Sequence, residues 1–566
     1  MTAKTFFMAL VYICNKYFTM RISILILSIS LSLMIQSCQP PKKNADLIVL
    51  HARVYKVDSS FSVAEAFAVK DGMFVDAGTD EEILARWKAE KEIDASGKFI
   101  YPGFNDAHCH FLGFGENLIR RADLTGTASM EEVVKRLREH FQKHQPGWLE
   151  GRGWDQNDWE NRHMPDNRLL NEAFPDIPVY IIRIDGHAAL ANDYALKLAG
   201  IMGDETVAGG TVVTRNGKPT GLLIDNAMDL VSIIIPASDE ENIKKALLLA
   251  QRECFGVGLT SVTDAGLELK AIRQIEKLQK NDSLKIRINA MISPTPENFE
   301  YFLPKGPVVQ PRLIVRSIKL YADGALGSRG AWLLEPYTDA PETSGLSMHP
   351  EVWYDSICSL AARAGYQVNI HAIGDRANRT VLNIFSKYTK GKDLRWRIEH
   401  AQVVHPDDIA RFGELNVVPS VQPTHATSDM YWAVDRLGPE RLKGAYAYRS
   451  LLNATGWLPL GTDFPIESIN PVNTFYAAIT RQDATGYPPG GFFPEQALTR
   501  TEALKGITLW PARASFEENV KGSIEPGKYA DFVILDTDLM QEDPVKLLQA
   551  KVLSTYIGGE CVYTRQ

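Results

Sequence analysis

Two histidines, His108 and His110, stand two positions apart at the end of a short apolar run. If this run forms a β-strand, both imidazoles lie on the same side of it, because side chains alternate along a strand. Two imidazoles that face one point can bind a divalent metal ion. The alternative is that both are polar residues at a strand end with a structural role, since a His-x-His pair is a weak indication by itself.

Three further candidate ligands, His371, His400 and Asp463, each end a later apolar run. In a barrel of parallel strands the carboxyl ends of the strands meet at one mouth, so residues distant in the sequence come together there. Each of the three alone is compatible with a structural role. Four histidines and one aspartate at the same rim favour a metal centre.

The elements that would position these residues alternate between strands and helices. Strands are expected at 99–110, 259–263, 286–292, 315–322, 367–371, 397–400, 417–421 and 458–462, and helices between them at, for example, 242–254, 352–364 and 376–388. Repeated βα units imply parallel strands, and eight of them predict an α/β fold, a (β/α)8 TIM barrel over residues 104–510. The stretch of about 120–236 is too long for one βα unit and is expected to be an insertion after barrel strand 1.

The two ends of the chain have a different pattern. Residues 46–103 and 511–566 contain short apolar runs separated by tight turns, such as the turn at 70–72. Two β-rich ends around a long middle predict one small β-sandwich domain that is built from both chain ends.

The first 45 residues are typical of an exported lipoprotein. Residues 1–37 have the character of a signal peptide, with a 14-residue apolar segment at 22–35 that is short for a membrane-spanning helix. Residues 35–38 resemble a bacterial lipobox, which predicts lipidation of Cys38 and a tether over 38–45. We therefore expect a membrane-anchored lipoprotein of the bacterial cell envelope, periplasmic or on the outer membrane. The alternative is a buried core segment, and the true start, Met1 or Met20, stays open.

Composition excludes several classes of protein. With 45% hydrophobic and 23% charged residues, the chain is globular rather than disordered, and its scattered cysteines form no metal-binding or redox pair. A net charge of −8 leaves no basic excess for nucleic acid. The expected partners are a small-molecule substrate and, through Cys38, the membrane, while the sequence leaves a monomer and a homo-oligomer open.

Several motifs together resemble the amidohydrolase superfamily of metal-dependent hydrolases, in the branch of the N-substituted formamide deformylases. The resemblance covers essentially the whole mature chain. Its motifs are Tyr-Pro-Gly-Phe-Asn-Asp-Ala-His-Cys-His at 101–110, Gly-Arg-Gly-Trp-Asp-Gln at 151–156, Asp-Gly-His at 185–187, the segment 319–329, His-Ala-Ile-Gly-Asp at 371–375, Arg-Ile-Glu-His-Ala-Gln at 397–402 and Gly-Thr-Asp-Phe-Pro at 461–465.

The resemblance implies a specific set of ligands and a mechanism. The implied metal ligands are His108, His110, Lys319, His371, His400 and Asp463. A lysine ammonium cannot bind a cation, so this role requires carboxylation of Lys319, which would give two metal ions instead of one. Imidazole and carboxylate ligands favour zinc. Asp463 is the expected catalytic base and acid beside a metal-activated hydroxide.

The expected reaction is hydrolysis of a C–N bond in an amide, formamide or related substrate. Trp154, His187 and Arg329 are the candidates for substrate binding; the alternatives are packing of the insertion for the first two and an ion pair with Asp323 for Arg329. Two other functions stay open: an ester or lactone hydrolase or an isomerase at the same site, and a non-catalytic metal-binding lipoprotein.

Overall fold

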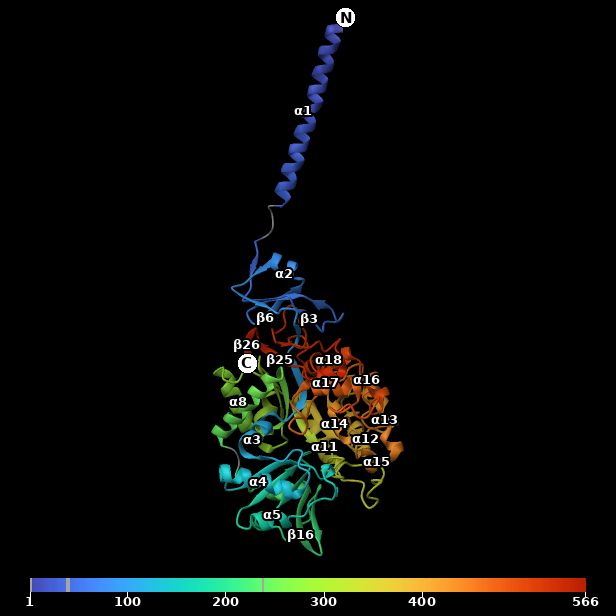
Figure 1. Cartoon of the computed structure of the whole chain (residues 1–566). Helices are drawn as coiled ribbons and strands as arrows, with labels where there is room; N and C mark the ends of the chain where they lie inside the picture. The colour runs from blue at the N-terminus through green and yellow to red at the C-terminus, as the bar shows by residue number, and fades with distance from the viewer. Residues whose placement is uncertain (1–2, 37–40, 237–238) are drawn as a thin grey trace.

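A barrel of parallel strands forms the centre of the protein in the computed structural model, which describes residues 3–36, 41–236 and 239–566 (Figure 1). The barrel strands are β10 (Phe104–Cys109), β17 (Leu259–Leu267), β18 (Arg287–Ile292), β20 (Leu313–Tyr321), β21 (Gln367–Ala372), β22 (Arg397–His400) and β23 (Val418–Ser420), paired in parallel in this order. The short β19 (Val308–Val309) pairs with β20 outside this path.

The eighth barrel strand is present only as an isolated β-bridge, and this bridge closes the barrel. Leu460 forms a parallel bridge with Val421, and the amide of Ala107 on β10 donates to the carbonyl of Leu460 over 3.2 Å. The predicted (β/α)8 barrel is therefore confirmed, and the carboxyl ends of its strands lie at one mouth.

Helices connect the strands, and several of them bury an apolar stripe. The helices between and after the barrel strands are α8 (Glu240–Gly256), α9 (Leu269–Lys280), α10 (Pro296–Phe302), α11 (Glu351–Ala364), α12 (Asp375–Phe385), α13 (Pro406–Glu414), α14 (Pro423–Asp429), α15 (Ala433–Leu442), α16 (Tyr448–Thr455), α17 (Pro471–Thr480), α18 (Arg500–Gly506), α19 (Leu509–Ala514) and α20 (Pro544–Leu547). On α9, for example, Ile272, Ile275 and Leu278 are buried at a spacing of three, which places them on one helix face. The expected helices at 242–254, 352–364 and 376–388 correspond to α8, α11 and α12, of which α12 ends earlier than predicted.

Both chain ends contribute to two packed sheets beside the barrel. The strands are β1 (Lys43–Asn44), β2 (Leu47–Leu50), β3 (Arg53–Tyr55), β4 (Val63–Ala64), β5 (Ala66–Lys70), β6 (Met73–Gly78), β7 (Trp87–Lys88), β8 (Lys91–Asp94), β9 (Phe99–Pro102), β24 (Phe532–Leu535), β25 (Val552–Ile557) and β26 (Glu560–Thr564), with α2 (Asp80–Arg86). One sheet contains strands from both chain ends, in the order β26-β25-β24-β9-β3-β4, and the other, β6-β5-β2-β8, contains strands from the N-terminal part alone. The strands β1 and β7 form a separate two-stranded pair. Phe67 of the second sheet packs edge-on against Phe532 of the first, with ring centroids 5.0 Å apart.

The chain segment between α3 (Phe111–Arg120) and α8 forms a separate sheet. Its strands are β11 (Ala122–Asp123), β12 (Leu149–Trp154), β13 (Val179–Arg183), β14 (Ala188–Ala191), β15 (Gly210–Arg215) and β16 (Lys218–Asp225), and its helices are α4 (Met130–His144), α5 (Arg168–Ala173), α6 (Asp193–Ala199) and α7 (Asp229–Ser232). This insertion after the first barrel strand has its own apolar core. In Figure 1 it lies at the end of the molecule opposite α1.

The helix α1 (Ala3–Gln36) extends away from the rest of the protein (Figure 1). Large apolar side chains in its first half are exposed, among them Phe6 at 75% and Tyr12 at 71%. Within the described part of the chain, no helix combines the length and the apolar character that a membrane crossing needs. Cys38, the expected lipidation site, lies outside the described residues.

Candidate metal centre

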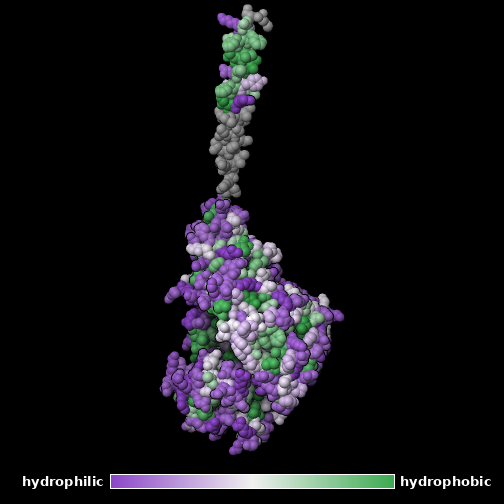
Figure 2. All heavy atoms as spheres, turned by 45° about the vertical axis from the view of Figure 1, so that its right-hand side comes forward, coloured by the Kyte–Doolittle hydropathy of each residue, from purple (hydrophilic) through white to green (hydrophobic). Residues whose placement is uncertain are grey.

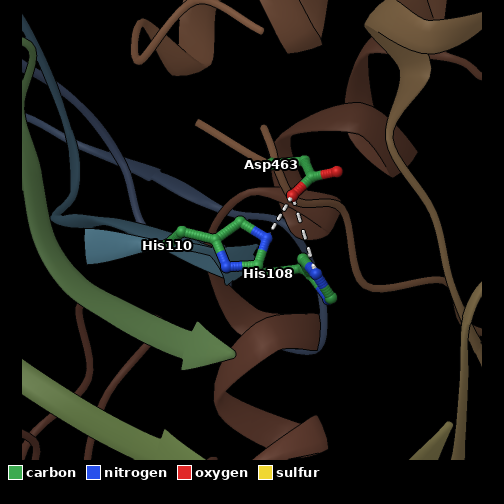
Figure 3. A group of neighbouring side chains, drawn as sticks. All are labelled: His108, His110 and Asp463. Atoms are coloured by element: carbon green, nitrogen blue, oxygen red, sulfur yellow. Dashed lines mark ion pairs between the residues drawn. The ribbon is translucent and has the colours of Figure 1, made fainter. Parts of the chain in front are cut away.

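The first strand of the barrel and the eighth strand position bring three candidate ligands together. Oδ1 of Asp463 lies 3.6 Å from Nε2 of His108 and 3.2 Å from Nε2 of His110 (Figure 3). The amide of Asp463 donates to the carbonyl of His108 over 2.8 Å, which holds the two segments in register. The predicted proximity of these residues is thus found in the structure.

The other oxygen of Asp463 faces a second pair of histidines. Oδ2 lies 3.5 Å from Nε2 of His425 and 4.0 Å from Nδ1 of His400. Two groups of possible ligand atoms, each within 4.8 Å of one another, therefore share this carboxylate: His108, His110 and Asp463 in one, and His400, His425 and Asp463 in the other.

The donor atoms fit a divalent metal ion. Oδ1 of Asp463 and Nε2 of His425 are buried and, among the described residues, accept or donate no hydrogen bond of good geometry. Buried polar atoms in folded proteins nearly always have a partner, so these unpaired atoms on Asp463 and His425 fit residues that hold a ligand. Imidazole and carboxylate donors are the set that zinc and similar divalent ions prefer.

Burial and mutual proximity set the charges that a metal site requires. Burial lowers the pKa of His108 to about 4 and those of His371 and His400 well below the usual value, so these imidazoles are neutral. Burial alone would raise the pKa of Asp463, but the neighbouring His110 and His108 hold it well below its usual range. Neutral imidazoles and an ionised carboxylate are the forms that coordinate a cation.

A buried ion pair orients His108. Oε2 of Glu399 accepts a hydrogen bond from Nδ1 of His108 over 2.6 Å, and the Arg397 guanidinium contacts both Glu399 and the carbonyl of Ala107. Burial by itself raises the pKa of Glu399, whereas Arg397 and His108 lower it, and the net pKa lies below the usual value. The ionised Glu399 therefore keeps the proton of His108 on Nδ1 and leaves Nε2 facing Asp463.

Lys319 lies beside this pair on β20. Its Nζ is buried 3.3 Å from Nε2 of His108. Burial lowers the pKa of Lys319 to about 8, although Glu399 and Asp463 act in the opposite direction. A larger fraction of this amine is uncharged near neutral pH than for an ordinary lysine, which is the form that carboxylation requires.

His371 and His187 lie next to the two ligand groups rather than within them. The ring of His371 is 4.5 Å from that of His400, and its Nε2 donates to the carbonyl of Gly324 over 3.3 Å. The ring of His187 lies 4.9 Å from that of His371, and its Nδ1 is 2.7 Å from Oδ1 of Asp225.

A cavity of about 1140 Å³ lies between the barrel mouth and the insertion. The insertion contributes polar residues that include Arg152 and His187. The barrel side contributes His110, His371, His400, His425, Lys319 and Asp463. Figure 2 shows the surface hollowed above the insertion, which forms the lower end of the molecule.

Two expected substrate-binding residues do not line this cavity. Trp154 is fully buried in the core of the insertion, where it packs beside Trp159 and donates from Nε1 to the carbonyl of Ile181. Its large apolar ring is therefore used for packing. Arg329 pairs with Asp339 over 2.8 Å and lines a separate cavity of about 540 Å³. The alternative partner, Asp323, instead accepts backbone hydrogen bonds from residues 332, 373 and 374.

His425 was not among the residues that the sequence suggested. It lies in α14, five residues after β23 ends at Ser420, instead of at a strand end. The available signal was the polar segment Gln422-Pro423-Thr424-His425 directly after the seventh strand, because loops that follow barrel strands surround the mouth.

A parallel barrel with histidines and an aspartate gathered at its mouth defines a metal-dependent hydrolase of the TIM-barrel type. The model of the amidohydrolase family matches residues 91–563, and the chain belongs to this family.

The chain is also similar to individual known proteins over most of its length. Protein LONG AFTER FAR-RED 3 of Arabidopsis thaliana is 34% identical over 543 residues, with 92% of each chain covered. An N-substituted formamide deformylase of Arthrobacter pascens is 26% identical and covers 92% of this chain and 98% of its own. The crystal structure of an uncharacterized metal-dependent hydrolase from Pyrococcus horikoshii superimposes with a TM-score of 0.72, at 29% identity, over 88% of this chain and 99% of its own.

Replacing His425 with alanine should reduce the metal retained per chain, because one of the orphaned donor atoms is removed. Metal content after dialysis, measured by inductively coupled plasma mass spectrometry, tests this. The exposed His163 provides a matched control, and its alanine variant should retain the wild-type content. Equal metal content in wild type and His425→Ala would exclude His425 as a ligand.

Lys319 should make the stability of the metal-free protein depend on pH. Its folded pKa, about 8, lies below the ordinary 10.5, so the unfolded chain binds the proton more tightly between these values. The contribution of Lys319 to stability should therefore increase as pH rises through this window and be lost as pH falls through 8. Relative to Lys319→Met, the wild type should gain up to about 3 kcal/mol in free energy of unfolding, measured with denaturant at a series of pH values. A difference that does not change with pH would contradict the assignment.

Proposed function

We propose that the protein is a metal-dependent hydrolase that cleaves the C–N bond of an amide, formamide or related small molecule. The observation that carries the proposal is the ionised carboxylate of Asp463, shared by two groups of histidines at the cavity in the barrel mouth. The similarity over nearly the whole chain to an enzyme named N-substituted formamide deformylase supports a C–N bond as the target.

The residues have separate roles in this reaction. His108, His110 and Asp463 would hold a divalent ion, which we propose to be zinc, with His400 and His425 available at the second oxygen of the carboxylate. When bound, the ion supplies Lewis-acid activation of water and of the substrate carbonyl. Lys319, carboxylated, would add an anionic donor beside His108 and favour two ions over one.

Asp463 transfers the proton in this proposal. Because its pKa is held low by the surrounding imidazoles, it is ionised at neutral pH and can accept the proton of the attacking water. The same carboxyl group then delivers this proton to the nitrogen of the leaving amine as the C–N bond breaks. His187, held through Nδ1 by Asp225, faces the cavity from the insertion and is placed to orient the substrate.

Replacing Asp463 with asparagine should lower kcat by about 10³-fold or more, because the isosteric amide cannot accept the proton. Release of the amine from simple formamides and acetamides measures the activity, and circular dichroism checks that the fold is retained. Asp407→Asn at the exposed start of α13 is the matched control and should keep wild-type activity. An active Asp463→Asn enzyme would exclude this residue as the base.

We further propose that a lipid on Cys38 anchors the protein to the bacterial cell envelope. The basis is the apolar segment 22–35 followed by the lipobox-like residues 35–38. Cys38→Ser should move the protein from the detergent-extracted membrane fraction to the soluble fraction, as immunoblotting of cell fractions would show. Cys561→Ser should leave it in the membrane fraction. A Cys38→Ser protein that stays in the membrane fraction would contradict lipid anchoring at this residue.

A further inference from the structure

Arg152 reaches the cavity from the insertion. It belongs to β12, pairs in register with Ile182 on β13, and lines the same cavity as the metal centre. One of its terminal nitrogens donates to the carbonyl of Ile184 over 3.1 Å. Its charge influences both Asp463 and Tyr321 across the cavity.

The guanidinium of Arg152 has no contacting carboxylate. Among the described residues, no acidic oxygen lies within ion-pair distance of it, and its Nε is buried without a hydrogen-bond partner. The two other arginines of the cavity differ in this respect. Arg121 pairs with Glu150 over 3.3 Å, and Arg183 is clamped between Asp155 and Asp185.

A positive charge without a contacting carboxylate is unfavourable in this environment. Burial lowers the pKa of Arg152 to about 10, and nearby Arg121 lowers it further, while Asp185 and Asp463 raise it. The side chain is still a cation at neutral pH. A partly desolvated charge without a counter-ion is unfavourable, and a planar guanidinium with unused donors is suited to bind a carboxylate or phosphate in a bidentate manner.

Most acidic groups of the cavity are already engaged. Asp185 pairs with Arg183, Asp225 with His187, Asp429 accepts from Tyr446 and Gln402, and Glu467 accepts from Ser428. Asp123, Asp158 and Asp229 also line the cavity, and burial raises the pKa of the latter two, which disfavours their charge. Among the described arginines of the cavity, Arg152 is thus the one without a contacting carboxylate.

We propose that Arg152 binds an anionic group of the substrate, so that the enzyme acts on amides that carry a carboxylate or a similar anion. This inference rests on the proposed function and extends it to a substrate class. The scissile amide lies at the metal centre on the barrel, and the anionic group lies at Arg152 on the insertion. The length of the substrate is then set by the span between the two walls of the cavity.

Hydrolysis of matched probes by the full-length, metal-loaded protein tests the proposal. The probes are N-acetyl and N-formyl amines that end in a carboxylate, a phosphonate, a methyl or an ammonium group, offered over several chain lengths. The wild type should prefer the anionic probes by about ten- to hundredfold in kcat/KM, which is typical of hydrogen bonds to a charged group. The ratio of carboxylate to phosphonate turnover identifies the anion. A wild type that prefers the neutral or ammonium probes overturns the proposal without any variant.

Variants of Arg152 test whether this residue causes the preference for anionic probes. Arg152→Gln should lose it mainly through a higher KM for the anionic probes, so that the ratio of anionic to methyl turnover falls towards one, and Arg152→Lys should restore part of this ratio. Arg215→Gln, an exposed arginine of the same sheet, is the control and should behave as wild type. An Arg152→Gln enzyme that keeps the full preference overturns the assignment of Arg152.

A binding measurement separates this inference from the proposed function. Isothermal titration calorimetry with butyrate, and with butan-1-ol as the neutral probe, requires no turnover. If no amide is hydrolysed but Arg152→Gln weakens butyrate binding, the anion site stands and the reaction assignment fails. If amides are hydrolysed and butyrate binds wild type and Arg152→Gln equally, the reaction stands and the anion site is overturned.

Discussion

Asp463 keeps its negative charge inside the protein because imidazoles surround it. Its two oxygens lie within 4.0 Å of nitrogens from His108, His110, His400 and His425. A carboxylate buried in apolar surroundings would take up a proton. Here the low pKa of the carboxylate and the low pKa values of His108 and His400 are maintained together, which leaves one anion among neutral donors. The candidate chemistry depends on this charge distribution.

Closure of the barrel holds this arrangement in place. Asp106 accepts hydrogen bonds from the amide of His108 and from the amide and hydroxyl of Thr462, and so connects the first strand to the eighth strand position. His400 and Asp463 have φ angles of 72° and 62°, a left-handed conformation that is unfavourable for residues with a Cβ. Such backbone conformations persist where the surroundings stabilise them, and they commonly occur at functional sites.

The insertion completes the site from the opposite side. Its core is formed by apolar residues such as Trp154, while the polar ends of its strands face the barrel mouth. Arg183 illustrates how this wall is stabilised, because it is fully buried between Asp155 and Asp185. Chemistry and recognition are thus divided between two structural units, which is a common use of loops and insertions on a barrel.

Sequence alone determined the features that depend on local periodicity. The alternation of apolar runs predicted the barrel and the helices α8, α11 and α12, and strand periodicity placed His108 and His110 on one side. The strand ends also identified His400 and Asp463, because the carboxyl ends of parallel strands meet at one mouth. The motif resemblance added Lys319, which the structure places 3.3 Å from His108.

Only the tertiary structure decided which side chains face each other across distant segments. His425 joins Asp463 from a helix after the seventh strand, where the only local signal is a polar segment behind the strand end. Trp154 turns into the core of the insertion, and Arg329 pairs with Asp339 away from the metal centre. The isolation of Arg152 is a property of the folded cavity, because it depends on where every surrounding carboxylate finds its own partner. Sequence periodicity specifies on which face of a strand a side chain lies. The partner of a charged side chain depends on how distant segments pack in three dimensions.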